Sequence, residues 1–363
     1  MSPRMHTPTS FDAHIPDLIL GYAIFVIAFI SLILGGYAWA AWNPISRKHL
    51  DRVSFRLLVC ALVANLIYDV TILCGAELTA SAACNFSAFA ANSCLMFAGI
   101  MFSSMALNLQ LVVVHGVNGQ KMERYYLFVA LVITAACDIP PYAAGALGFW
   151  DGDKTCWFNS PSRTVQLQWF LGTQAFWLFL MSTCEVISFL TIVGYMIIGH
   201  RLSSGIPGTA TPSLPWAPTL PKPPIVLYRA IIIRIGLYPL VSCFLNITGC
   251  ILALHQVQDP VLTEVNWRLT IVDILIYILR PMVYAVLAAT DPSFTRALRA
   301  LRRPASKTSF HQPDPSHVQR KTESISLSSL ASFTDWPPRR GTGVGGIDDG
   351  STSVEDLEFT RQI

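Results

Sequence analysis

Seven runs of apolar residues, each about 20 residues or longer, dominate this 363-residue sequence. A helix needs roughly 20 predominantly apolar residues to cross the hydrocarbon core of a bilayer. Only 13% of the residues are charged, whereas an ordinary globular domain has about 25%. The runs therefore predict an all-α membrane protein, with a seven-transmembrane helix bundle over residues 18–290. The predicted helices cover residues 18–42, 55–75, 86–115, 125–148, 165–198, 228–254 and 269–289.

Lys and Arg residues gather in the loops that follow the first, third, fifth and seventh runs. Short loops rich in Lys and Arg stay on the cytoplasmic side during insertion. The opposite side carries only Arg4, Lys154, Arg163 and the borderline Arg268. We therefore expect a multi-pass protein of the plasma membrane with its N-terminus outside, residues 1–17 as a short extracellular tail, and its C-terminus inside.

Two of the nine cysteines stand apart from the others, most of which lie inside apolar runs. Cys84 lies at the outer mouth of the third predicted helix, and Cys156 lies in the loop "FWDGDKTCWF" between the fourth and fifth. Both face the oxidising side of the membrane, where disulfides persist. We predict a disulfide bond between them, with two free thiols as the alternative. The bond would hold Trp150, Asp151, Asp153 and Trp157 over the bundle as a lid.

These features resemble a G-protein-coupled receptor over about residues 18–303. The resemblance rests on the outside N-terminus, seven helices, the cysteine pair, the proline in "GLYPLVSCF" of the sixth helix, and "RPMVY" before "DPSF" in the seventh. The segments "NLQLVVVHG", "YRAIIIRIGLYPL" and "LRPMVYAVLAATDPSF" look most like fungal receptors of the cyclic-AMP-receptor-like and secretin-like grouping. The resemblance implies signal transduction from an extracellular small molecule or nutrient to a cytoplasmic heterotrimeric G protein.

Two motifs depart from rhodopsin-type receptors. Those receptors end the third helix with Asp/Glu-Arg-Tyr, where this chain has Val113, Val114 and His115. They carry Asn-Pro-x-x-Tyr in the seventh helix, where this chain has Arg280, Pro281 and Tyr284. The activation switch of rhodopsin-type receptors therefore cannot be transferred to this sequence.

We single out four of the charged residues within the predicted spans, and each is a functional hypothesis because a charge at bilayer depth is costly without a partner. They are Asp69, Glu185, Asp273 and Arg280. From the helical rise, Arg280 lies close to mid-membrane, level with Asn65 on the second helix and one turn from Asp69. We predict an ion pair between Arg280 and Asp69 that Asn65 supports, with Asp273 as a competing partner.

This pair has two interpretations. In the first it is part of a switch, because Pro281 removes a backbone donor beside Arg280 and should kink the helix, and Tyr284 lies in the next turn. In the second it is a static bridge that fixes helix packing. Glu185 has candidate partners in Asn108, Gln110 and Arg234, among which the sequence does not choose.

At the cytoplasmic end we expect Arg229, Arg234 and His115 to face the G protein. The alternative for the two arginines is snorkelling toward lipid phosphates. Pro239 lies in the following turn of the sixth helix, and the resemblance implies that it lets this helix bend outward.

Ligand-binding candidates are polar or aromatic residues of the outer helical halves, together with the lid. Their acids, amides and one arginine suggest a small polar ligand, although polar and aromatic residues also belong at the membrane interface. The candidates are Glu77, Asn92, Gln168, Gln174, His255, Arg268, Asp273 and Trp157.

The loops and tail complete the predicted organisation. Residues 200–227 form a third cytoplasmic loop that is too rich in proline to fold. Residues 291–303 read as an amphipathic eighth helix with arginines on one face, held by anionic membrane lipid. Residues 304–363 are expected to be disordered. The stretch "KTESISLSSLASFT" resembles the substrate of a receptor kinase, which implies a kinase or an arrestin-like partner.

Other classes of seven-helix protein fit less well. A retinal protein needs a lysine inside the bundle, but all six lysines lie in loops or tail. A zinc-dependent membrane hydrolase needs clustered histidines and acids, and a transporter is expected to show an internal repeat. The transporter and the hydrolase remain the alternatives. We expect no enzyme activity, no cofactor, no metal site and no nucleic-acid partner.

Overall fold

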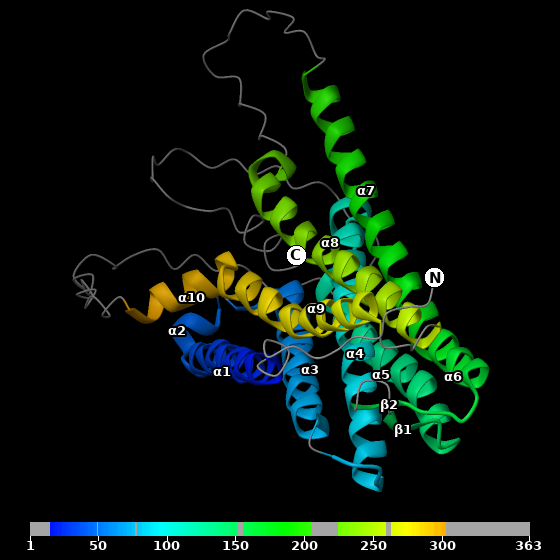
Figure 1. Ribbon diagram of the computed structural model, residues 1–363. Helices are drawn as coiled ribbons and strands as arrows, with labels where there is room; N and C mark the ends of the chain where they lie inside the picture. The colour runs from blue at the N-terminus through cyan, green and yellow to red at the C-terminus, as the bar shows by residue number, and fades with distance from the viewer. Residues whose placement is uncertain are drawn as a thin grey trace, which may run out of the picture.

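The computed structural model in Figure 1 describes residues 15–48, 50–76, 78–150, 155–204, 224–258 and 263–302. Of residues 199–204 and 224–235 it describes the backbone alone. Most of the predicted extracellular tail, most of the proline-rich loop and the predicted disordered tail lie outside this part of the chain.

The described chain is almost entirely helical, and seven of its helices are long and apolar enough to cross a membrane. This confirms the predicted count of spans and a multi-pass membrane protein. The spans are formed by α1 (Ile15–Trp42), α3 (Val53–Ala76), α4 (Ala82–His115), α5 (Gly119–Ala143), α6 (Arg163–Phe170) continuing into α7 (Phe176–Ser204), α8 (Pro224–Gln258) and α9 (Glu264–Ala289). Two short helices, α2 (Pro44–Arg47) and α10 (Pro292–Arg302), follow α1 and α9.

Successive spans alternate in direction, so the bundle has two ends. The end where α3 finishes and α4 begins carries a disulfide bond, and we call it the disulfide end. The other end carries α2 and α10, which contact each other (Figure 1), and we call it the α10 end.

Helix α4 is the centre of the bundle. It packs against α3, α5, α7 and α8, and most of its residues are buried. Its buried positions include many small residues, which let neighbouring helix backbones approach closely. Such close packing drives helix association in membranes, where the hydrophobic effect does not act between helices. They are Ser87, Ala88, Ala91, Ala98, Gly99, Ser104 and Ala106. At Gly99 a methyl group would already touch Met181 and Leu178 of α7, at 3.4 and 3.5 Å.

Both ends of α4 are set by local sequence signals. Ser81 caps its start, where the Ser81 side chain accepts a hydrogen bond from the Cys84 amide at 3.3 Å. Gly116 ends it with φ of 64°, a left-handed conformation that glycine adopts without a Cβ penalty. The cap at Ser81 starts the helix four residues earlier than the predicted boundary at residue 86.

The fourth predicted helix had wrong boundaries, and the fifth contains a turn that was not predicted. The fourth predicted helix, residues 125–148, covers Gly119–Ala143 instead, because Gly145 takes φ of 66° and the chain turns into strand β1 (Leu147–Trp150). The fifth, residues 165–198, contains a π-helical turn at Leu171–Ala175 between α6 and α7. Hydropathy alone is insensitive to both features.

A disulfide bond joins Cys84 to Cys156, as predicted, with Cα atoms 5.3 Å apart. Cys156 lies on strand β2 (Thr155–Phe158), which pairs with β1 in an antiparallel hairpin. The sequence analysis missed this hairpin and treated the segment as a loop. The bond therefore ties the start of the central helix to a hairpin that lies between α5 and α6 in the chain.

Removing this bond should destabilise the bundle. The disulfide closes 72 residues of chain, and such cross-links typically contribute about 2–4 kcal/mol. We expect Cys84→Ser and Cys156→Ser each to lower the thermal unfolding midpoint in detergent, and a reductant to lower the wild-type midpoint to the same value. Cys74→Ser is the matched control, because Cys74 is an exposed free thiol near the same end. A reductant effect that persists in Cys156→Ser would contradict the assignment.

Candidate functional site

An aromatic cluster forms beside the disulfide. Trp157 packs against Trp150, Phe158 and Phe170, with ring centroids 5.3 to 5.5 Å apart. Gln166 on α6 donates a hydrogen bond from Nε2 to the Phe158 carbonyl at 2.7 Å, which fastens the hairpin to that helix. The hairpin is thus a rigid element at the disulfide end. Asp151 and Asp153, which were expected in the same lid, lie outside the described residues.

The predicted ligand-binding candidates separate into two groups. Asn92, Gln174 and Asp273 are buried in the bundle. Gln168, His255 and Arg268 are exposed, so the structure does not place them in an interior site. Arg268 pairs with Glu264 of its own helix at 2.6 Å, and both side chains are exposed.

Glu77 lies outside the described residues, and Trp157 belongs to the aromatic cluster. Fewer of the candidate ligand-binding residues therefore lie inside the bundle than we expected from the sequence.

Helix α9 carries a buried polar stripe of three residues, Asp273, Arg280 and Tyr284. Spacings of 7 and 4 residues bring them to one helical face, because each residue turns the helix by about 100°. All three are at most 7% exposed. Asp291 follows at a further spacing of 7, just beyond the end of α9, and is 5% exposed. We call the first three the α9 polar stripe.

The predicted ion pair between Arg280 and Asp69 is absent from the structure. Within the described part of the chain, Nε and Nη2 of Arg280 and Oδ2 of Asp69 have no hydrogen-bond partner. Instead the α3 to α9 contact at this level includes the rings of Tyr68 and Tyr277, with centroids 6.4 Å apart. Tyr68 and Asp69 point in different directions because they are neighbours on one helix.

Asn65 does not support such a pair either. Its Nδ2 donates to the carbonyl of Ala61 in its own helix at 2.8 Å.

Glu185 of α7 is a carboxylate that the structure brings near Arg280. Glu185 is fully buried, and its Oε1 accepts a hydrogen bond from Ser242 of α8 at 3.3 Å. Asn246 donates to the Ser242 hydroxyl at 3.1 Å. The carboxylate is also close enough to Arg280 to interact with it electrostatically.

Several atoms of this network have no partner among the described protein atoms. They include Oε2 of Glu185 and Nε and Nη2 of Arg280, whereas the Tyr284 hydroxyl lies close to both Arg280 and Ser242. Buried polar atoms normally have hydrogen-bond partners, either protein or ordered water. The donors of Arg280 and the second carboxylate oxygen of Glu185 are chemically complementary.

Asp138 is a buried acid that the sequence analysis missed. It lies on α5 beside Ser93 of α4 and is 2% exposed. The rule that singled out the other intramembrane charges applies to it equally. It lies inside the fourth predicted helix, residues 125–148, but was not among the charged residues singled out there.

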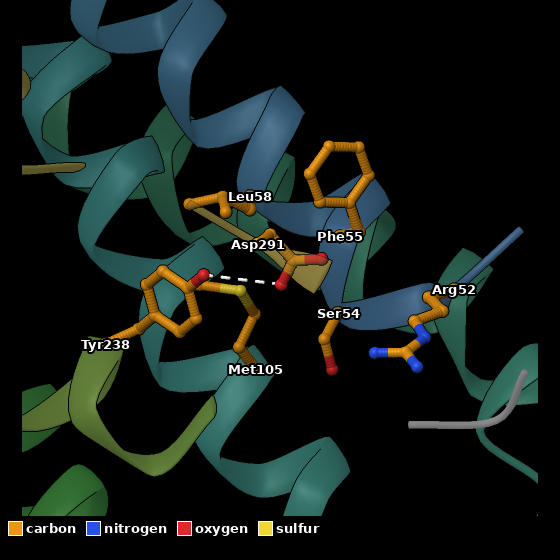
Figure 2. A pocket seen from close by; sticks show the side chains of 7 residues that line it. All are labelled: Arg52, Ser54, Phe55, Leu58, Met105, Tyr238 and Asp291. Carbon is orange, nitrogen blue, oxygen red and sulfur yellow. Dashed lines mark hydrogen bonds between the residues drawn. The ribbon is translucent and has the colours of Figure 1, made fainter. Parts of the chain in front are cut away.

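A small cavity lies in the interior at the α10 end, and Figure 2 shows the side chains that line it. Its volume of about 10 Å³ is close to the space that one water molecule needs. The side chains come from α3 and the residue just before it, from α4 and α8, and from the segment joining α9 to α10. They are Arg52, Ser54, Phe55, Leu58, Met105, Tyr238 and Asp291.

Tyr238 and Asp291 join α8 to the start of α10 across this cavity. The Tyr238 hydroxyl contacts Oδ2 of Asp291 at 3.4 Å and the Leu287 carbonyl at 3.1 Å, and Figure 2 draws the contact with Asp291. Asp291 also caps α10, because its Oδ1 accepts from the Ser293 amide at 2.7 Å. Any movement of α8 away from α9 must break the Tyr238 contacts. Tyr238 precedes Pro239 directly, but no sequence pattern marked it.

The residues expected to face a G protein are only partly described. His115 is exposed at the end of α4. The backbone of Arg229 and Arg234 belongs to α8, but their side chains lie outside the described residues. Pro239 and Pro281 both lie inside helices, α8 and α9 respectively.

Comparison with models of known protein families and with curated proteins found no match.

Among the described residues, no group of three or more His, Cys, Asp or Glu side chains is placed to hold a metal ion. Functional inference therefore starts from the geometry of the bundle.

The geometry predicts energetic coupling between Glu185 and Arg280. In a double-mutant cycle with Glu185→Gln and Arg280→Met, we expect a coupling energy of about 1–2 kcal/mol, because opposite charges in one buried network attract strongly. Unfolding of the purified protein in detergent measures each corner of the cycle. The control cycle, Asp69→Asn with Arg280→Met, should couple by less than about 0.5 kcal/mol. A larger value in the control than in the test cycle would make Asp69 the partner of Arg280.

Proposed function

We propose that this protein is a seven-transmembrane receptor of the G-protein-coupled type, which transmits an extracellular small-molecule or nutrient signal to a heterotrimeric G protein. Its N-terminus lies outside the cell and its α10 end faces the cytoplasm, in the plasma membrane. The excess of Lys and Arg at the α10 end supports this orientation. A resemblance to fungal receptors supports the finer assignment.

The observation that carries the proposal is the α9 polar stripe. Polar side chains inside a membrane bundle are expensive and usually functional, and this stripe follows one helix for 11 residues toward Asp291 at the α10 end. Arg280 of the stripe and Glu185 of α7 retain buried atoms without hydrogen-bond partners in the described chain. Such atoms gain partners if the helices rearrange, so the interior supports a second arrangement of the same bundle.

Ligand binding takes place at the disulfide end in this proposal. The disulfide and Gln166 hold the hairpin rigidly beside the start of α4, and Asp273 is the buried acid of the stripe nearest this end. Asn92 and Gln174 are two further buried polar residues available to a small polar ligand. Both retain a buried side-chain atom without a hydrogen-bond partner in the described chain.

The response takes place at the α10 end. Pro239 and Pro281 are the positions at which α8 and α9 bend, because each proline removes a backbone hydrogen bond from its helix. Outward movement of α8 breaks the contacts of Tyr238 with Asp291 and Leu287. A cleft then opens for the G protein, with His115, Arg229 and Arg234 at its edge.

In this proposal α10 is the interfacial eighth helix. Its Phe294 and Ala297 are buried, and the Phe294 ring packs on Phe55 with centroids 6.1 Å apart. Arg296, Arg299 and Arg302 are exposed, which suits contact with anionic lipid. The serines after residue 320 would serve a receptor kinase and an arrestin-like protein.

Tyr238→Phe tests the receptor mechanism without knowledge of the ligand. The substitution removes the hydroxyl that joins α8 to Asp291, so the active arrangement costs less to reach. A hydrogen bond contributes about 1 kcal/mol, and we therefore expect about fivefold more ligand-independent nucleotide exchange on a responsive G-protein α subunit. Exchange is measured with reconstituted full-length protein and a panel of α subunits.

Tyr195→Phe is the matched control, because Tyr195 is an exposed tyrosine on α7, and it should exchange like the wild type. Equal exchange by wild type and Tyr238→Phe would exclude the α8 contact as a restraint while leaving a receptor. No exchange by either protein with any α subunit would contradict the receptor proposal.

A further inference from the structure

A groove opens at the α10 end between α1, α2 and the start of α3, separate from the interior network. Its volume of about 610 Å³ falls in the range of small-molecule sites. Its lining combines apolar and charged side chains. The lining residues are Tyr37, Ala41, Pro44, Arg47, Lys48, Leu50, Asp51 and Arg56.

The available positive charge of the groove comes from Arg47 and Lys48. Arg56 is already neutralised, because it pairs with Asp51 at 2.8 Å and with Glu123 of α5 at 2.5 Å. Arg47 and Lys48 are exposed and make no ion pair within the described part of the chain. The groove therefore has two adjacent cations, Arg47 and Lys48, that are unpaired among the described residues, beside the paired Arg56, and this arrangement favours binding of an anion.

Tyr37 adds a directional donor to the groove. Its ring packs against Phe55, with centroids 5.7 Å apart, and its hydroxyl makes no hydrogen bond among the described residues. The hydroxyl lies within electrostatic reach of both Arg47 and Arg56. A phosphate oxygen near the two cations could therefore also accept a hydrogen bond from Tyr37.

Exposed tryptophans beside the groove indicate that it adjoins the expected membrane boundary. Trp39 and Trp42, at the end of α1, are 63% and 90% exposed, and exposed tryptophans typically mark the interface between hydrocarbon and water. Earlier in the same helix, and so deeper in the expected membrane, Leu32 is 70% exposed. An apolar side chain exposed there can contact the acyl chains of a lipid. Phosphate-binding groups and an apolar path thus adjoin each other at one membrane boundary.

We propose that this groove binds the phosphorylated headgroup of an anionic phospholipid. Arg47 and Lys48 neutralise the headgroup phosphate, the Tyr37 hydroxyl donates to one of its oxygens, and the acyl chains lie along the exposed face of α1. Basic pockets between membrane helices recognise such headgroups by this chemistry. The site is independent of the proposed receptor function, because none of its residues belongs to the α9 polar stripe or to the Tyr238 contacts.

The test is a titration of the full-length protein in detergent with phosphatidylinositol 4-phosphate, followed by native mass spectrometry. We expect one tightly bound lipid in the wild type and much weaker binding of phosphatidylcholine. Arg47→Gln combined with Lys48→Gln should weaken the tight site about 30-fold, at about 1 kcal/mol for each cation. Tyr37→Phe should weaken it about tenfold, as expected for a hydrogen bond to a charged group.

Matched control variants distinguish a specific lipid site from non-specific electrostatic attraction between cations and anionic lipid. Lys121→Gln with Arg124→Gln removes two exposed cations at the same end, and Tyr125→Phe removes an exposed hydroxyl there. Both controls should leave the tight site within about threefold of wild type, because neither changes a groove residue.

The proposal is overturned if Tyr37→Phe binds like the wild type, or if the groove pair loses no more affinity than the control pair. Either result means general electrostatic attraction. Equally tight binding of the deacylated headgroup, glycerophosphoinositol 4-phosphate, would identify a soluble phosphate compound as the ligand and overturn the lipid assignment.

Discussion

Every backbone amide and carbonyl inside a bilayer must find its hydrogen-bond partner within the protein, and this requirement determines the rest of the structure. It restricts the seven spans to helices. Helices in lipid then associate through close packing and polar contacts, and the small residues of α4 place that helix at the centre. The only strands in the described chain, β1 and β2, lie at the end of the bundle, held by the disulfide.

The same cost applies to polar side chains, which makes the interior informative. Asp273, Arg280 and Tyr284 follow one face of α9, and Glu185 and Ser242 approach them from α7 and α8. The network is incomplete among the described protein atoms, whereas Asp291 at the α10 end accepts two hydrogen bonds. An incomplete polar network in the bundle interior is compatible with a bundle that adopts two arrangements. The phosphate-binding groove at α1 to α3 uses different residues.

Features that depend on one segment of the chain alone could be predicted from the sequence. Hydropathy found all seven spans, and compartment chemistry found the bond between Cys84 and Cys156. Sequence reasoning failed where side-chain direction decides. Arg280 and Asp69 are at similar depth, but depth does not tell which side of each helix they occupy, and the expected ion pair does not form. Gln168 and His255 were assigned to an interior site on the same basis and are exposed.

The sequence by itself determined that this protein crosses a membrane with seven helices, because span length and hydropathy are properties of each segment alone. It also identified four of the charges that lie within the spans, Asp69, Glu185, Asp273 and Arg280, although it missed Asp138. Only the tertiary structure decided which of them meet, since that depends on the rotation of each helix about its axis. Tyr238 and Asp291, 53 residues apart, and the groove that joins Tyr37 to Arg47 arise in this way from packing between helices whose contacts no local pattern encodes.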